Sequence, residues 1–183
     1  MKKIVCLWGG PGTGKSTTCA AVFAKLKQLG FNAEMNREYI KNWVWEGRSV
    51  LPGDQVYITA KQARNEVIFM RKNLDFIVSD SPLALTTFYG DVYDKYEGMG
   101  QACRAIVKQH HLICKDLGYK VEHIFLVRTK AYNQAGRNEN EETAREYDVR
   151  IKAFLDAYPI KYRTVTCDNG ATDEIVNILT EKK

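Results

Sequence analysis

The sequence predicts one α/β domain in which a five-stranded parallel sheet is covered by helices on both faces. Apolar, strand-like runs and amphipathic stretches alternate along all 183 residues, with no repeat and no low-complexity linker between them. Strands that alternate with helices pair in parallel, because each connection crosses a face of the sheet. A glycine-rich segment directly after the first apolar run also predicts a loop at the carboxyl edge of that sheet.

Five short runs rich in apolar or β-branched residues predict the strands Lys3–Trp8, Phe31–Met35, Asp75–Ser79, Lys120–Val127 and Ile160–Thr166. The 3.6-residue spacing of apolar side chains predicts the helices Lys15–Leu29, Asp54–Lys72, Gln101–Leu117 and Thr172–Leu179. A further helix is expected to open at a capping box formed by Asn138 and Glu141 and to end at Pro159.

The composition excludes several classes of protein. With 45% hydrophobic and 27% charged residues, the chain is neither collagen-like nor disordered. No apolar run approaches the ~20 residues that span a bilayer, so we expect no membrane partner and a cytoplasmic location. The five scattered cysteines form no C-x-x-C pair and are expected to be reduced core thiols. The net charge of +5 is compatible with phosphate-bearing ligands.

The strongest local signal is the phosphate-binding motif G-x-x-x-x-G-K-[ST], which Gly9–Ser16 matches at every fixed position. Glycines let the backbone curl so that several N–H groups point at one phosphate, and the following helix adds a partial positive charge. Lys15 can then reach the β- and γ-phosphates of a nucleotide. The residues expected to bind the nucleotide here are Gly10, Pro11, Gly12, Thr13, Gly14, Lys15, Ser16 and Thr17.

A magnesium site is predicted from two oxygen-bearing side chains. The Ser16 hydroxyl in the phosphate-binding motif commonly ligates Mg²⁺. Asp80 ends an apolar strand at the same sheet edge, where the second metal contact of a P-loop protein lies. The alternative is that Asp80 caps the helix that follows.

A cationic segment follows the fourth predicted strand. Arg128, Lys130 and Arg137 occur there before the first acidic residue, Glu139, which predicts a short lid at about residues 128–140. Such a lid can close over a triphosphate and stabilise the transferring group. Arg128 and Arg137 suit this role best, because a guanidinium binds phosphate oxygens bidentately. The alternative is a solvated surface loop.

The run Glu34-Met35-Asn36-Arg37-Glu38-Tyr39, the Asp80 strand end and the Gly136-Arg137 lid resemble a family of P-loop kinases. This family includes the ribosylnicotinamide-kinase domain of the bacterial NAD-biosynthesis regulator and small AAA-type ATPases or kinases of phages and bacteria. The resemblance implies the three-layer P-loop NTPase sandwich with sheet order 2-3-1-4-5, ATP as donor and Mg²⁺ as cofactor. It also implies that the loop at Asp168 borders the adenine.

The second strand is expected to end across the phosphate loop, where an acceptor enters. Glu34, Arg37 and Glu38 cluster there. A carboxylate can take the proton of an attacking hydroxyl, and Glu34, Glu38 and Asp80 are all candidates for this catalytic role. Arg37 can hold an acceptor phosphate or the transferring one, and the alternative is an Arg–Glu salt bridge.

Aromatic and amide side chains complete the acceptor-side hypothesis. Trp43 and Trp45 are two positions apart, so both cannot face the core of one helix, and one of them is expected to be semi-exposed. This one could stack on a base or ring, with peripheral packing as the alternative. Gln62 and Asn65 lie on one face of their predicted helix and could hydrogen-bond a nucleobase edge, with a polar outer face as the alternative. Tyr89 and Asp91 are further candidates for the acceptor pocket.

These patterns together predict a single-domain, ATP- and Mg²⁺-dependent kinase, monomeric or homodimeric. Its acceptor is expected to be a nucleoside, nucleotide or ribosylnicotinamide-like small molecule. A polynucleotide or DNA-base hydroxyl kinase is one alternative, disfavoured because the basic residues are dispersed rather than arranged as a stripe. A regulatory P-loop ATPase that acts with a protein partner is the other.

Overall fold

The five strands form one parallel sheet in the order β2-β3-β1-β4-β5. The computed structural model describes residues 2–51, 53–95, 97–129, 131–133, 140–158 and 160–181. The strands are β1 (Lys2–Trp8), β2 (Ala33–Asn36), β3 (Phe76–Ser79), β4 (Tyr119–Val127) and β5 (Tyr162–Thr166). The predicted parallel sheet is confirmed, as is the strand order that the family resemblance implied.

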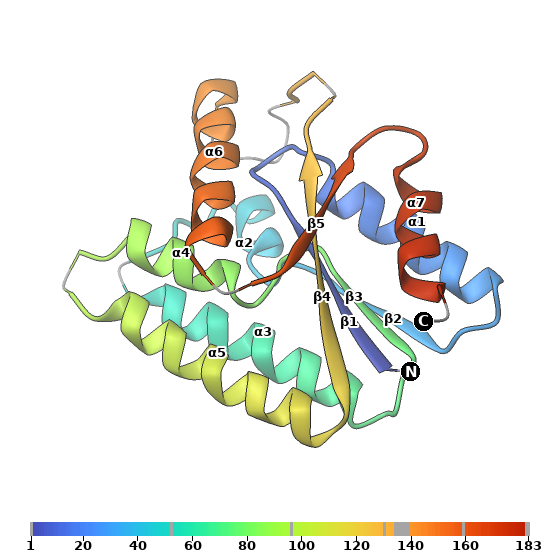
Figure 1. Cartoon of the computed structure of the whole chain (residues 1–183). Helices are drawn as coiled ribbons and strands as arrows, with labels where there is room; N and C mark the ends of the chain where they lie inside the picture. Colours follow the sequence, from blue (N-terminus) through green and yellow to red (C-terminus); the bar gives the residue numbers. More distant parts are fainter. Residues whose placement is uncertain are drawn as a thin grey trace.

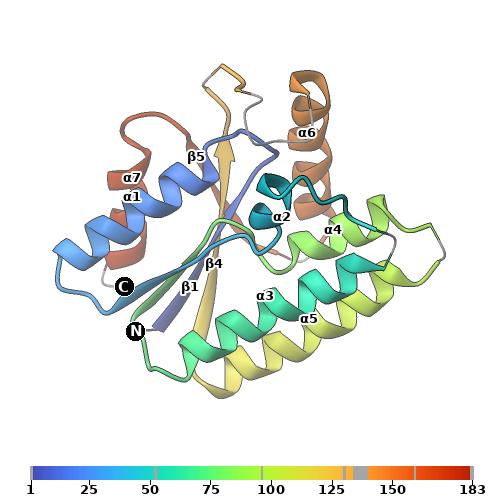
Figure 2. The same ribbon diagram turned by 180° about the vertical axis from the view of Figure 1, so that it is seen from behind.

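Helices cover both faces of this sheet, which gives three layers (Figures 1 and 2). On one face lie α1 (Lys15–Gln28) and α7 (Ala171–Thr180). On the other face lie α3 (Asp54–Met70), α5 (Met99–Asp116) and α6 (Glu141–Ala157), with the short helices α2 (Lys41–Trp45) and α4 (Leu85–Val92) above α3 and α5 in Figure 1. A separate hydrophobic cluster fills the space between the sheet and each helical layer.

The central strand β1 is buried on both faces, as its continuous apolar run predicts. Side chains alternate along it: Val5 and Leu7 pack with the α1 and α7 layer, whereas Ile4, Cys6 and Trp8 pack with the opposite layer. All five cysteines are free and buried, which confirms that they are core thiols. Within the described part of the chain, no helix is long and apolar enough to cross a membrane.

The cap of α6 differs from the prediction. The helix begins at Glu141, and Asn140 is its N-cap, with the Asn140 side chain accepting a hydrogen bond from the Thr143 N–H at 2.9 Å. A capping side chain bonds the amide three residues on, so Asn140 pairs with Thr143. The capping box predicted from Asn138 and Glu141 is therefore wrong, and Asn138 itself lies outside the described residues.

Helix α4 has no counterpart among the predicted elements. It follows the Asp80-Ser81-Pro82 strand end, and its first turns contain two threonines whose hydroxyls bond carbonyl oxygens three residues earlier, Thr86 to Leu83 and Thr87 to Ala84. Threonine and glycine lower helix propensity, so local composition conceals a helix that tertiary packing stabilises. Helix α4 places Tyr89 beside the site described below.

Because the strands are parallel, their carboxyl ends meet at one edge of the sheet. The phosphate loop follows β1, the Arg37–Tyr39 segment follows β2, Asp80 follows β3, Arg128 follows β4 and Asp168 closely follows β5. The upward arrowheads in Figure 1 mark this edge.

Candidate active site

The phosphate loop joins β1 to α1 through three glycines with positive φ: Gly9 at 144°, Gly12 at 74° and Gly14 at 108°. L side chains rarely adopt these angles. Close neighbours also exclude a side chain at Gly14, where a Cβ would lie 2.6 Å from the Cys167 sulfur. The motif glycines are therefore required by both backbone conformation and packing.

Lys15 bends back over this loop. Its Nζ donates hydrogen bonds to the carbonyl oxygens of Gly9 at 2.8 Å and Gly10 at 2.9 Å. Burial lowers the pKa of the Lys15 ammonium, and the nearby carboxylates of Glu38, Asp80 and Asp148 partly offset this. The cation is thus held by carbonyl dipoles at the phosphate loop, where an anionic ligand would supply charged oxygens instead.

Asp80 is buried at the end of β3, and its Oδ1 accepts a hydrogen bond from the Glu38 N–H at 2.8 Å. Ser16 is exposed in the first turn of α1. A hydroxyl and a carboxylate are the hard oxygen ligands that Mg²⁺ prefers, and this ion usually takes few protein ligands beside phosphates and water. The two predicted metal residues therefore fit Mg²⁺ chemically.

The Glu34, Arg37 and Glu38 cluster divides in the structure. Glu34 lies within β2, where its carboxylate accepts the Met35 N–H at 3.0 Å. Arg37 is exposed, and neither residue lines the cavity beside the phosphate loop. Glu38 does line it. Of the two glutamates, only Glu38 faces the space in which an acceptor could bind.

A single cavity of about 630 Å³ extends from the phosphate loop toward α3 and α4. Its phosphate end is lined by Pro11, Gly12, Gly14, Lys15, Ser16 and Thr17. The rest of its lining includes three tyrosines and apolar side chains, together with three cations: Tyr39, Tyr89, Tyr93, Val44, Ile58, Leu85, Lys41, Arg48 and Lys95. The cavity therefore joins the phosphate loop to an aromatic end that also carries cationic side chains.

Gln62 lines this cavity, but both ends of its side-chain amide form hydrogen bonds with backbone groups. It is buried in α3, its Oε1 accepts the Tyr39 N–H at 3.3 Å, and its Nε2 donates to the Ser81 carbonyl at 3.2 Å. The side chain thus ties the segment after β2 to the segment after β3. This brace holds Glu38 and Asp80 in place from either side.

The two tryptophans of α2 separate as predicted. Trp43 is 6% exposed and its ring stacks against Tyr57 at 6.2 Å, whereas Trp45 is 68% exposed. The Arg48 guanidinium covers the Trp43 ring at 3.5 Å from its centroid. Neither indole lines the cavity, although Val44 between them does.

Arg128 lies beside the phosphate loop. Its Nη2 donates to the Pro11 carbonyl at 2.7 Å and to the Thr13 hydroxyl at 3.3 Å, and its Nε bonds Asp148 at 2.7 Å. Arg137 and most of the predicted 128–140 lid lie outside the described residues. The ring of Tyr132 lies directly over Gly12, where a Cβ would meet it at 2.8 Å.

Sequence reasoning missed Asp148. This aspartate of α6 accepts a hydrogen bond from the Gly10 N–H at 2.6 Å and ion-pairs with Arg128. The available signal was an acidic residue on the apolar face formed by Ala144, Ile151 and Leu155. A carboxylate on such a face requires a buried partner.

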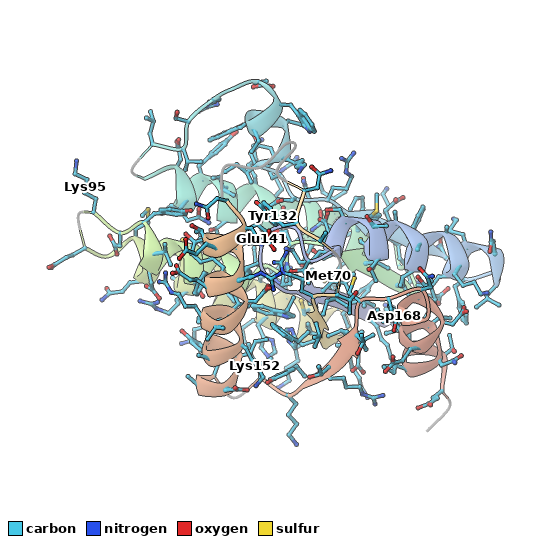
Figure 3. The ribbon with its side chains drawn as sticks, turned by 90° about the horizontal axis from the view of Figure 1, so that it is seen from above. Met70, Lys95, Tyr132, Glu141, Lys152 and Asp168 are labelled. Carbon is cyan, nitrogen blue, oxygen red and sulfur yellow. The ribbon has the colours of Figure 1, made fainter. Side chains whose placement is uncertain are left out.

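Asp168 is exposed at the start of α7, and its Oδ1 accepts the Gly170 N–H at 2.8 Å. In Figure 3, Asp168 and Lys95 lie on opposite sides of the molecule with Tyr132 between them. Asp168 does not line the cavity, so its predicted position beside the adenine stays a prediction.

Comparisons with solved structures bear on the fold. NadR protein in complex with NR aligns with a TM-score of 0.64 and 15% identity, over 99% of this chain and 52% of the NadR chain. NadR in complex with NAD and AMP-PNP gives a TM-score of 0.63 at 15% identity, over 100% of this chain and 51% of that one. This chain thus spans about half the length of NadR.

The APS kinase CysC of Mycobacterium tuberculosis, in complex with AMPPNP and APS, aligns with a TM-score of 0.52 and 14% identity over 98% of both chains. At such identities the likeness shows the fold, which is that of P-loop kinases. No curated protein matches the sequence significantly. The family model AAA_28, an AAA domain, matches residues 4–171. Because this match includes the phosphate loop and covers nearly the whole chain, this chain belongs to the AAA_28 family of AAA domains.

Proposed function

We propose that this protein is an ATP- and Mg²⁺-dependent kinase that phosphorylates a nucleoside, a nucleotide or a ribosylnicotinamide-like small molecule. The observation that carries this proposal is the continuous cavity of about 630 Å³, which joins the phosphate loop to an aromatic pocket. A kinase needs donor phosphate and acceptor in one enclosed space, because positioning supplies most of its catalysis.

At the donor end, the loop N–H groups and the N-terminus of α1 would bind the phosphates of ATP. Lys15 would exchange its bonds to the Gly9 and Gly10 carbonyl oxygens for bonds to the β- and γ-phosphates. Ser16 and Asp80 would hold Mg²⁺, which when bound neutralises charge on the triphosphate.

Glu38 is the proposed general base. It lines the cavity, and the hydrogen bond from its N–H to Asp80 holds its backbone beside the predicted metal residue. As the acceptor oxygen bonds to the γ-phosphorus, Glu38 would take the hydroxyl proton and the bond between the γ-phosphorus and the β–γ bridging oxygen would break, releasing ADP. Glu34, with its carboxylate bonded within β2, is less suited to this role.

The aromatic end of the cavity supports an acceptor with a flat ring. Tyr39, Tyr89 and Tyr93 lie there with apolar neighbours, and aromatic side chains stack on rings in offset or edge-on arrangements. Such a pocket suits the base or pyridine ring of a nucleoside-like molecule and leaves its hydroxyl or phosphate near Glu38.

Arg128 and Arg137 are the proposed cations that stabilise the transferring group. For Arg137, which follows Arg128 in the predicted lid, we expect Arg137→Ala to lower turnover more than affinity for ATP, because its charge would act mainly in the transition state. If Arg137→Ala lowered only the affinity for ATP and left turnover unchanged, Arg137 would be a contact to the bound ATP rather than to the transition state.

The direct test is transfer of label from [γ-³²P]ATP to pooled nucleosides, nucleoside monophosphates, ribosylnicotinamide and DNA oligomers. The proposal expects a labelled small molecule in one pool. Label on DNA would move the function to nucleic-acid modification. Free phosphate released at the same rate in every pool would refute the kinase and indicate an ATPase that acts with a protein partner.

A further inference from the structure

Asp148 is a partly buried acid whose bonds all lead to the phosphate loop or to the arginine beside it. Its Oδ1 accepts from the Gly10 N–H at 2.6 Å and from the Thr13 hydroxyl at 3.1 Å, and its Oδ2 accepts from Arg128 Nε at 2.7 Å. Burying a carboxylate costs free energy unless such partners satisfy it. The side chains of Arg128 and Asp148 are 6% and 20% exposed.

These contacts orient the Arg128 guanidinium and leave one amino group unused. Nε bonds Asp148, and Nη2 bonds the Pro11 carbonyl, while Nη1 is the one buried side-chain nitrogen or oxygen of the described residues that lacks a hydrogen-bond partner. A buried N–H without an acceptor is costly, and more so when charged. Arg128 Nη1 therefore lacks a hydrogen-bond acceptor, and a bound ligand can provide one.

The position of Nη1 indicates which ligand group this is. Nη1 lies 3.3 Å from where a Cβ of Gly12 would be, and Gly12 lines the phosphate end of the cavity. Gly12 itself has no side chain between Nη1 and the loop backbone, and the Tyr132 ring reaches the same point at 2.8 Å. A guanidinium amino group beside a phosphate loop is suited to an anionic phosphate oxygen.

We propose that Asp148 is a positioning residue for nucleotide binding: it orients Arg128 so that Nη1 bonds an oxygen of the phosphate chain. The same carboxylate ties α6 to the loop at Gly10, where a Cβ would lie 2.6 Å from Asp148 Oδ1. Glycine is thus required at position 10 by the approach of α6, since a Cβ there would also lie 2.7 Å from the Ala144 carbonyl oxygen. This inference rests on the nucleotide site of the proposed function and is independent of the acceptor.

The test compares Asp148→Asn with Asp156→Asn in the full chain by calorimetric titration with MgATP and with inorganic tripolyphosphate. Asp156 is a matched control, since it lies on the same helix in an exposed ion pair with Lys152. Loss of one charge-assisted hydrogen bond weakens binding about tenfold or more. We expect that loss for both ligands in Asp148→Asn, less than a twofold change in the control, and partial recovery in Asp148→Glu.

Arg128→Lys separates positioning from a purely structural effect. It keeps the charge and leaves the bonds of Asp148 to Gly10 and Thr13 in place, so it also tests the inference if Asp148→Asn does not fold. The double variant should bind no more weakly than Arg128→Lys alone, because both changes remove the same contact. If the losses in the double variant were additive, the inference would be overturned. It would also be overturned if Arg128→Lys bound tripolyphosphate as tightly as the wild type does, because the guanidinium would then contact the nucleobase of ATP instead of its phosphates. Failure of the kinase proposal would instead appear only in the transfer assay.

Discussion

Replacing Glu66 by glutamine is expected to remove a pH-dependent part of the folding free energy, because Glu66 holds a buried imidazolium. His110 Nε2 lies 3.0 Å from Glu66 Oε2, with side chains 9% and 1% exposed, and Asn36 Nδ2 donates to the other Glu66 oxygen at 3.0 Å. Burial alone would lower the pKa of His110. Hydrogen bonds to Cys114 and Glu66, with the charge of Glu66, instead raise it from 6.5 to about 10.

The direction in which stability changes with pH follows from the linkage between proton binding and folding. A histidine with a raised pKa stabilises the fold fully below its unfolded pKa of 6.5 and loses that effect as the pH rises through about 10. At pH 7.5 the difference between the two pKa values corresponds to about 3 kcal/mol. Between pH 7.5 and 9.5, the free energy of unfolding of the wild type should fall relative to Glu66→Gln by up to about 1.3 kcal/mol per pH unit, since Cys114 supplies part of the raised pKa and remains in the variant.

Urea unfolding at several pH values, followed by tryptophan fluorescence, measures this difference. His123, which accepts the Trp8 indole N–H at 3.0 Å, stays neutral over the range because burial lowers its pKa to about 4. Glu141→Gln removes an exposed ion pair on α6 and serves as the control, with an expected effect below about 0.5 kcal/mol. A difference between wild type and Glu66→Gln that stays constant from pH 6.5 to 9.5 would refute the charged pair.

Three other changes test the site and its scaffold. Lys15→Ala should lower phosphoryl transfer at least about a thousandfold while circular dichroism stays unchanged, and retained activity would mean that the phosphate site is misassigned. Gly14→Ala should lower the free energy of unfolding in urea by more than about 1 kcal/mol, because φ is 108° and the new Cβ would lie too close to the Cys167 sulfur. Adding Cys167→Ala should remove the clash but leave the cost of the backbone angle. Trp43→Ala should cost about 3 kcal/mol and the exposed Trp45→Ala less than about 0.5 kcal/mol, and equal losses would contradict the burial of Trp43.

Much of the fold is readable from short stretches of sequence. The phosphate loop is local: an apolar strand, the fixed glycines and Lys15 follow one another, so their spacing determines both conformation and chemistry. Apolar periodicity likewise locates the long helices and all five strands to within a few residues. Helix α4 escapes this reasoning, since its threonines and glycine disfavour a helix that packing stabilises.

The acceptor side depends on which face of β2 and of the following segment each residue occupies. Glu34 and Glu38 are equivalent by residue type, yet Glu34 remains within the edge strand, and Glu38 follows it into the cavity. A shift of one residue reverses the direction of a side chain, and sequence predicts strand ends less accurately than that.

The sequence by itself determined the class of fold and the phosphate-binding loop, because each depends on neighbours along the chain. Only the tertiary structure decided which distant groups meet: Asp148 with Gly10 and Arg128, Glu66 with His110, and Gln62 with the segments after β2 and β3. Their members are 19 to 138 residues apart. The physical reason is that a buried charge or amide is stable only beside its partner, and packing of the whole chain brings that partner into place.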